Sequence, residues 1–137
     1  MRQDTLRLND VETIPRALEE GVLYVSQKYK TAAHLCCCGC GNKGVTPLKP
    51  GSWRLEVQAG TPSLYPSVGN WSLPCQSHYV VRRGHVNWAK KFSLEKIQAN
   101  REHDRILRDA YLASLTPSKS RSLWWRALHW LRVKKDK

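Results

Sequence analysis

The chain has 137 residues and a formal net charge of +12, with 41% hydrophobic and 25% charged residues. This length suits one hydrophobic core with an appendage and excludes two independent domains, and the composition is that of a folded protein, not a disordered or fibrous one. No run approaches the roughly 18 apolar residues of a membrane span and the opening residues lack the apolar stretch of a signal peptide, so we expect a cytoplasmic protein.

The positive charge is concentrated after residue 89. Residues 1–89 hold 10 Lys and Arg against 6 Asp and Glu, whereas residues 90–137 hold 13 against 5. The basic excess therefore belongs to the C-terminal segment and indicates that this segment meets an acidic protein, an RNA or a membrane surface. It is no strong evidence that the rest of the chain binds nucleic acid.

Up to residue 89 the chain is predicted to form short strands separated by turns, with helical periodicity only around residues 16–20. Arg83 and Gly84 favour a tight turn that makes a terminal hairpin. Trp71 and Trp88 are expected to pack in the core of this unit. The predicted strands span residues 22–26, 31–36, 45–48, 53–58, 63–65, 77–81 and 85–89.

After this unit the pattern changes to that of helices. Apolar residues within 94–115 recur mostly at spacings of three and four, with Ser93 as the N-cap. A second helix is predicted over 122–134, where a stripe of Trp and Leu lies among Arg and Lys. The sequence thus predicts an α+β protein, with a β-rich domain over residues 1–91 and a basic, Trp-rich helical extension over residues 92–137.

The cysteines point to a metal site. Four of the five lie in the segment His-Leu-Cys-Cys-Cys-Gly-Cys-Gly of residues 34–41, and the fifth is the distant Cys75. Cysteines this close to one another cannot staple a disulfide framework, whereas thiolates from one glycine-rich turn and a distant residue suit a tetrahedral zinc ion. Such a site is structural, because four protein ligands leave no open position for a reactive water. The alternative is a set of free thiols in the core.

Two sets of ligands fit this pattern. If the segment enters as a strand, Cys36, Cys38 and Cys40 share one face and bind zinc together with Cys75. Cys37 then points the other way and serves as a small buried apolar residue. The alternative is a knuckle in which Cys37 and Cys40 form the ligand pair.

A serine and a histidine offer a candidate catalytic pair. Ser67 is predicted to lie in a loop, and a serine nucleophile needs a base such as His78 within hydrogen-bond reach. The backbone amides of Gly69 and Asn70 could stabilise an oxyanion beside Ser67. Ser77 is a poor candidate, since neighbouring residues on a strand point to opposite faces.

Two other interpretations of these residues remain open. Ser67 can be an ordinary turn serine, with His78 as a structural histidine. The spacing Cys75-Gln-Ser-His78 also makes His78 a candidate zinc ligand, and a metal-bound imidazole could not act as a base.

Several blocks of the sequence occur together in a known family, namely residues 34–41, Thr46-Pro-Leu, Trp53-Arg-Leu, residues 63–71 and Cys75-Gln-Ser-His-Tyr. Over about residues 5–89 the chain resembles the bacterial ubiquitin-like operon protein E family, BubE. The resemblance implies a zinc-containing, β-rich protein encoded beside bacterial ubiquitin-like proteins and their E1-like and E2-like enzymes. It further implies a serine-type, deubiquitinase-like peptidase that releases the ubiquitin-like protein from conjugates.

The resemblance also implies roles for particular residues. Ser67 would be the nucleophile and His78 the base, which leaves Cys36, Cys38, Cys40 and Cys75 for zinc. The segment after Phe92 is not part of the family pattern, so the resemblance says nothing of its use.

The sequence thus supports two functions of different class. The first is a peptidase whose partners are a bacterial ubiquitin-like protein and its E1-like and E2-like enzymes. The second is a non-catalytic zinc module that binds an acidic protein or RNA. The apolar stripe of the helix predicted over 122–134 is expected to pack on its own chain, and the alternative is docking on a partner or an anionic membrane.

Overall fold

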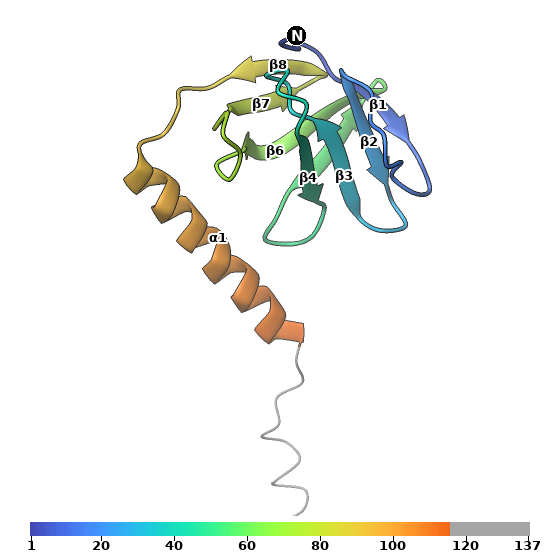
Figure 1. The fold of residues 1–137 in the computed structure, drawn as a ribbon. Coiled ribbons are helices and arrows are strands. Elements are labelled where there is room, and N and C mark those ends of the chain that lie inside the picture. The colour runs from blue at the N-terminus through green and yellow to red at the C-terminus, as the bar shows by residue number, and fades with distance from the viewer. Residues whose placement is uncertain (116–137) are drawn as a thin grey trace, which may run out of the picture.

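The computed structural model describes residues 1–115, and the helix predicted over 122–134 lies outside them. Within the described residues the chain forms eight strands followed by one helix (Figure 1). The elements are β1 (Arg7–Asp10), β2 (Val22–Ser26), β3 (Thr31–Leu35), β4 (Lys43–Pro47), β5 (Arg54–Gln58), β6 (Thr61–Gly69), β7 (His78–Arg82), β8 (His85–Trp88) and α1 (Leu94–Leu115).

The strands make two four-stranded sheets, in the orders β1-β2-β3-β4 and β5-β6-β7-β8. β1 pairs with β2 in parallel, and the other neighbouring strands are antiparallel. The start of the chain ties the two sheets together, because Thr5 bridges to His85, the first residue of β8, before the chain enters β1. The amide of Leu6 also donates to the carbonyl of Gly84 at 2.7 Å.

The hydrophobic core lies between the two sheets. β2 contributes Leu23 and Val25, while Leu64 of β6 and Tyr79 of β7 enter from the opposite sheet, and all four side chains are buried. Alternation within β7 places Tyr79 and Val81 in the core, so the side chains between and beside them face outward. This outward face of the second sheet carries the candidate site.

Tight turns connect the strands of the second sheet. Arg83 and Gly84 both have positive φ, at 48° and 77°, as a two-residue hairpin turn of the primed type requires. The predicted terminal hairpin is therefore confirmed. Gly84 suits the second position because a residue without a Cβ adopts this conformation without strain.

The predicted helix is also confirmed. It begins at Leu94, and the backbone amide of Lys96 donates to the Oγ atom of Ser93 at 3.4 Å, as expected of an N-cap. Figure 1 shows that α1 lies outside the two sheets and passes the loop between β4 and β5, where a Cβ atom on Gly51 would lie 3.5 Å from the carbonyl oxygen of Leu107. Within α1 only Ile97 is buried. No helix within residues 1–115 has the length and apolarity needed to cross a bilayer.

Three details differ from the sequence-based expectations. β1 was not predicted, because only four residues pair there and their side chains are half-buried or exposed. Residues 16–20 form no helix and contain only a bend and a turn. β6 spans nine residues instead of the three expected, because a bulge between Leu64 and Val68 lets the strand continue through Pro66.

Candidate functional site

Four cysteine sulfurs gather at one end of the two sheets. The Sγ atoms of Cys36, Cys38, Cys40 and Cys75 all lie within 4.8 Å of one another. The sulfur of Cys36 lies 3.3 Å from that of Cys38 and 3.9 Å from that of Cys75. In a tetrahedral site with metal–sulfur bonds of about 2.3 Å, as for zinc, the sulfurs are about 3.8 Å apart. The donor set and its spacing therefore fit a metal ion.

The cysteines meet for a different reason than the expected strand alternation. β3 ends at Leu35, and the following residues turn back on themselves, so the expectation of a continued strand is wrong. The turn is closed by the amide of Cys36, which donates to the carbonyl of Asn42 at 2.7 Å, and by that of Gly39, which donates to Cys36 at 3.0 Å. A tight turn converges alternate sulfurs on one point, which an extended strand does not do.

Cys37 is outside this cluster. Its side chain is fully buried in the core, and burial raises the pKa of its thiol to about 12. The alternative knuckle needs the sulfurs of Cys37 and Cys40 side by side. Within residues 1–115 the clustered sulfurs include that of Cys40 but not that of Cys37. Cys37 occupies the place of a small apolar residue, as the first of the two ligand sets requires.

Amide and hydroxyl groups surround the cluster. The buried side-chain amide of Asn70 donates to the sulfur of Cys36 at 3.2 Å, and the hydroxyl of Ser77 lies 3.0 Å from the same sulfur. On the exposed side the amide of Asn42 donates to the sulfur of Cys40 at 3.2 Å. Despite the opposing effect of burial, the Asn42 hydrogen bonds lower the pKa of Cys40 to about 6. Donors aimed at sulfur favour the thiolate form that metals bind.

Ser67 and His78 meet on the outward face of the second sheet. The Oγ atom of Ser67 lies 2.9 Å from the Nε2 atom of His78. The expectation that Ser67 lies in a loop is wrong, because it lies within β6, in the bulge that separates Leu64 from Val68. A bulge re-aims the side chains of a strand, and here it leaves the serine opposite a histidine of β7.

The other ring nitrogen of His78 determines the direction of this hydrogen bond. Nδ1 lies 3.0 Å from the carbonyl oxygen of Lys90. A carbonyl can only accept, so Nδ1 carries the proton, and Nε2 of the neutral ring accepts from the hydroxyl of Ser67. This is the tautomer that a general base needs. Within residues 1–115 the group that could hold a metal ion does not include His78. The structure therefore gives no support to the alternative role of His78 as a metal ligand.

Two aromatic side chains enclose the histidine. The ring centroid of His78 lies 5.0 Å from that of Trp71 and 4.4 Å from that of Phe92, and these two rings stack on each other at 5.1 Å. The expectation that Trp71 packs in the core is therefore wrong, whereas Trp88 does pack against it. Gly69 makes room for the indole, since a Cβ atom at this position would lie 2.3 Å from Nε1 of Trp71.

One of the two expected oxyanion donors is engaged elsewhere. The backbone amide of Asn70 donates to the carbonyl of Ser77 at 2.9 Å, so it is already engaged.

Ser77 itself points toward the cysteine cluster while His78 points toward Ser67. The opposite orientation expected for these neighbours is confirmed.

Comparison with known protein families shows which family the chain belongs to. A family model described as bacterial ubiquitination-like system serine protease (BubE) matches residues 10–89, which is more than half of the chain. The chain belongs to the BubE family. The resemblance seen in the sequence is therefore confirmed. No curated protein and no solved structure matches the chain.

The BubE match covers both candidate centres but not everything that contacts them. Ser67, His78 and all five cysteines lie within it, whereas Lys90 and Phe92 follow directly after its end. Sequence reasoning missed both residues as parts of the site. A carbonyl carries no signal in a sequence, and the only hint for Phe92 is a single aromatic residue just after the last strand.

Proposed function

We propose that this protein is a serine-type, deubiquitinase-like peptidase that releases or processes a bacterial ubiquitin-like protein. Ser67 is the nucleophile and His78 the general base. A zinc ion held by Cys36, Cys38, Cys40 and Cys75 supports the fold around them.

The pairing of Ser67 with His78 carries this proposal. The family is described as a serine protease, and within residues 1–115 Ser67 is the one serine whose hydroxyl hydrogen-bonds a histidine ring. The Lys90 carbonyl takes the place that a carboxylate holds in a Ser-His-Asp triad, since both fix the ring through Nδ1. The orienting group is neutral, so it sets the tautomer without adding a charge to stabilise the imidazolium.

The reaction follows from these positions. His78 Nε2 takes the hydroxyl proton as Ser67 Oγ bonds to the carbonyl carbon of the scissile amide. His78 then gives that proton to the leaving nitrogen, the C–N bond breaks, and the acyl group remains as an ester on Ser67. A water molecule, deprotonated by His78, attacks this ester, and the proton returns to Ser67 as the acid product leaves.

Trp71 and Phe92 hold the base in position. Rings against His78 restrict its rotation and keep bulk water from one side of the imidazole. Zinc, when bound by four thiolates, supplies cross-linking between the turn after β3 and the segment before β7 and takes no part in the chemistry. This division of roles leaves all proton transfers to Ser67 and His78.

The family also suggests partners and a location. A protease of a bacterial ubiquitination-like system meets a ubiquitin-like protein as its substrate, and the E1-like and E2-like enzymes of that system are its functional neighbours. The five cysteines form no disulfide, which suits a reducing compartment. We therefore place the protein in the cytoplasm.

Hydrolysis of a fusion between the ubiquitin-like protein of the same system and a reporter protein tests the proposal. Wild-type protein should cleave the fusion, while Ser67→Ala and His78→Ala should each lower kcat/KM by about 10³-fold or more. Ser72→Ala is the matched control, because Ser72 is an exposed serine in the adjoining turn. Cleavage by Ser67→Ala at the wild-type rate would contradict the proposal, as would loss of the metal from His78→Ala.

A further inference from the structure

The outward face of the second sheet continues from Ser67 and His78 toward the other end of the strands. His78 and Arg82 lie on the same face of β7, since Tyr79 and Val81 between them point into the core. Four residues of strand span about 13 Å. We call the path along the outward face from His78 to Arg82 the track. Tyr65 and Ser67 of β6 flank it on the neighbouring strand.

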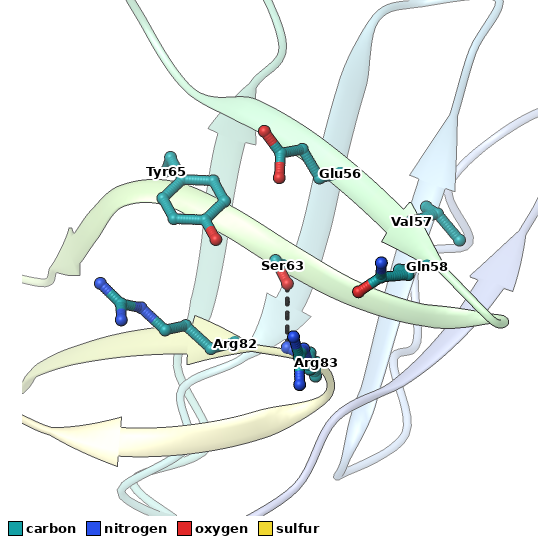
Figure 2. Close-up of a pocket in the computed structure, with 7 residues that line it drawn as sticks. All are labelled: Glu56, Val57, Gln58, Ser63, Tyr65, Arg82 and Arg83. Carbon is teal, nitrogen blue, oxygen red and sulfur yellow. Dashed lines mark hydrogen bonds between the residues drawn. The ribbon is translucent and has the colours of Figure 1, made fainter.

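A pocket lies at the far end of this track. It has a volume of about 770 Å³ and is lined by side chains of β5, of β6, and of the end of β7 with its turn (Figure 2). Its lining includes Glu56, Gln58, Ser63, Tyr65, Arg82 and Arg83. The hydroxyl of buried Ser63 accepts a hydrogen bond from the backbone amide of Arg83 at 2.9 Å, which ties β6 to the turn after β7 at this pocket.

The charges of the pocket are unbalanced. Its one carboxylate, Glu56, already pairs with Arg54 at 2.9 Å, and Arg54 in turn lies over the ring of Tyr65 at 5.3 Å. Within residues 1–115 neither Arg82 nor Arg83 forms an ion pair. Two guanidinium groups beside a phenol and an amide are suited to bind a carboxylate by charge-assisted hydrogen bonds.

We propose that this pocket is a substrate subsite that binds an acidic side chain of the polypeptide cleaved at Ser67. This inference rests on the proposed function, since Ser67 sets the origin of the track. An extended substrate laid along the face covers about 13 Å with four residues, so the Asp or Glu that enters the pocket lies about four residues from the scissile bond. Arg82 and Arg83 supply the positive charge that attracts its carboxylate.

Charge reversal in the pocket provides the test. The probe is the ubiquitin-like fusion, and p-nitrophenyl acetate serves as a small ester that is too short to reach the pocket. Arg82→Glu should lower kcat/KM for the fusion at least 10-fold relative to that for the ester, chiefly by raising KM. Arg16→Glu, an equal charge change at an exposed residue before β2, should leave this ratio unchanged. An unchanged ratio in Arg82→Glu would overturn the inference.

The substrate supplies the complementary change. Replacing the acidic residue about four positions from the scissile bond by Lys should weaken cleavage by wild-type protein and restore cleavage by Arg82→Glu. Failure of every such exchange to restore cleavage would show that the pocket binds no acidic side chain of the substrate.

Binding separates this inference from the proposed function. In a Ser67→Ala background, the Kd for the intact fusion should rise at least 10-fold when Arg82→Glu is added, and this readout needs no turnover. Absence of hydrolysis by wild-type protein together with this change in Kd would contradict the peptidase assignment and retain the pocket. Hydrolysis that depends on Ser67, together with an unchanged Kd, would support the peptidase assignment and overturn the pocket as a subsite.

Discussion

The side-chain amide of Asn70 donates a hydrogen bond to the sulfur of Cys36 across 3.2 Å, although 34 residues separate them in the chain. The same amide also donates to the hydroxyl of Ser77 at 3.0 Å. Asn70 directly follows the strand that carries Ser67, and Ser77 directly precedes His78. The cysteine cluster and the Ser67–His78 pair are therefore mechanically connected through one buried side chain.

Asn70→Ala should consequently weaken both centres. It removes a donor to the Cys36 sulfur, for which we expect metal affinity to fall about 10- to 100-fold. It also frees the ends of β6 and β7, so kcat for the fusion should fall as well. Asn42→Ala is the control, because Asn42 also donates to a sulfur of the cluster, that of Cys40, but is exposed. A chelator competition assay measures the metal affinity of both variants, and steady-state kinetics measure their kcat. Equal losses of kcat in the two variants would show that the connection through Asn70 is absent.

The cysteine cluster should bind one zinc ion per chain and stabilise the fold. Metal analysis of purified protein should find about one zinc ion, and a chelator should lower Tm because the ion joins segments from different parts of the chain. Cys75→Ser should lose the metal, whereas Cys37→Ala should retain it, since Cys37 is buried outside the cluster. Loss of zinc from both variants, or a Tm indifferent to chelator, would contradict this ligand set.

Phe92 should act on the rate and not on the fold. Phe92→Ala removes a ring that packs 4.4 Å from that of His78, so the base loses part of its support and kcat should fall about 10- to 100-fold. Leu94→Ala, two residues later and 70% exposed, should change neither kcat nor Tm. Kinetics with the small ester read this effect directly. A rise in KM at constant kcat would instead make Phe92 a substrate contact.

The contact between Gly69 and Trp71 should appear as a coupling between two substitutions. Gly69→Ala places a methyl group against the indole, and such overpacking costs about 1–3 kcal/mol in free energy of unfolding. In a Trp71→Ala background the same substitution should cost close to nothing. Urea unfolding of the four proteins measures the coupling, and additive effects would show that the indole does not limit this position.

Much of the fold could be predicted from local patterns. Alternation, β-branched residues and the Arg83-Gly84 turn predict β2, β5 and β8 within a residue or two, and apolar spacing with the Ser93 N-cap predicts α1. β1 could not be predicted, because a short, poorly buried strand that pairs in parallel has no periodic pattern of apolar residues. The length of β6 could not be predicted, because a proline within a segment argues against a continuous strand. Here a bulge accommodates the proline within β6.

The candidate site could be predicted in its side chains but not in its setting. Cysteine spacing identifies the clustered sulfurs, although a turn and not strand alternation brings them together. Ser67 and His78 could be named only as one candidate pair, with roles implied by the family resemblance, and the bulge in β6 brings them together. The Lys90 carbonyl could not be found, because a backbone group depends on where the chain runs and not on which residue it belongs to.

Covalent labelling of Ser67 tests the central claim most directly. An alkyl fluorophosphonate reacts with a serine only when a neighbouring base activates the hydroxyl, and mass spectrometry locates the adduct. The wild-type protein should carry one adduct, on Ser67, which should be absent from Ser67→Ala and form far more slowly in His78→Ala. An adduct on a different serine, or equal labelling of wild type and His78→Ala, would contradict the assignment of Ser67 and His78 as nucleophile and base.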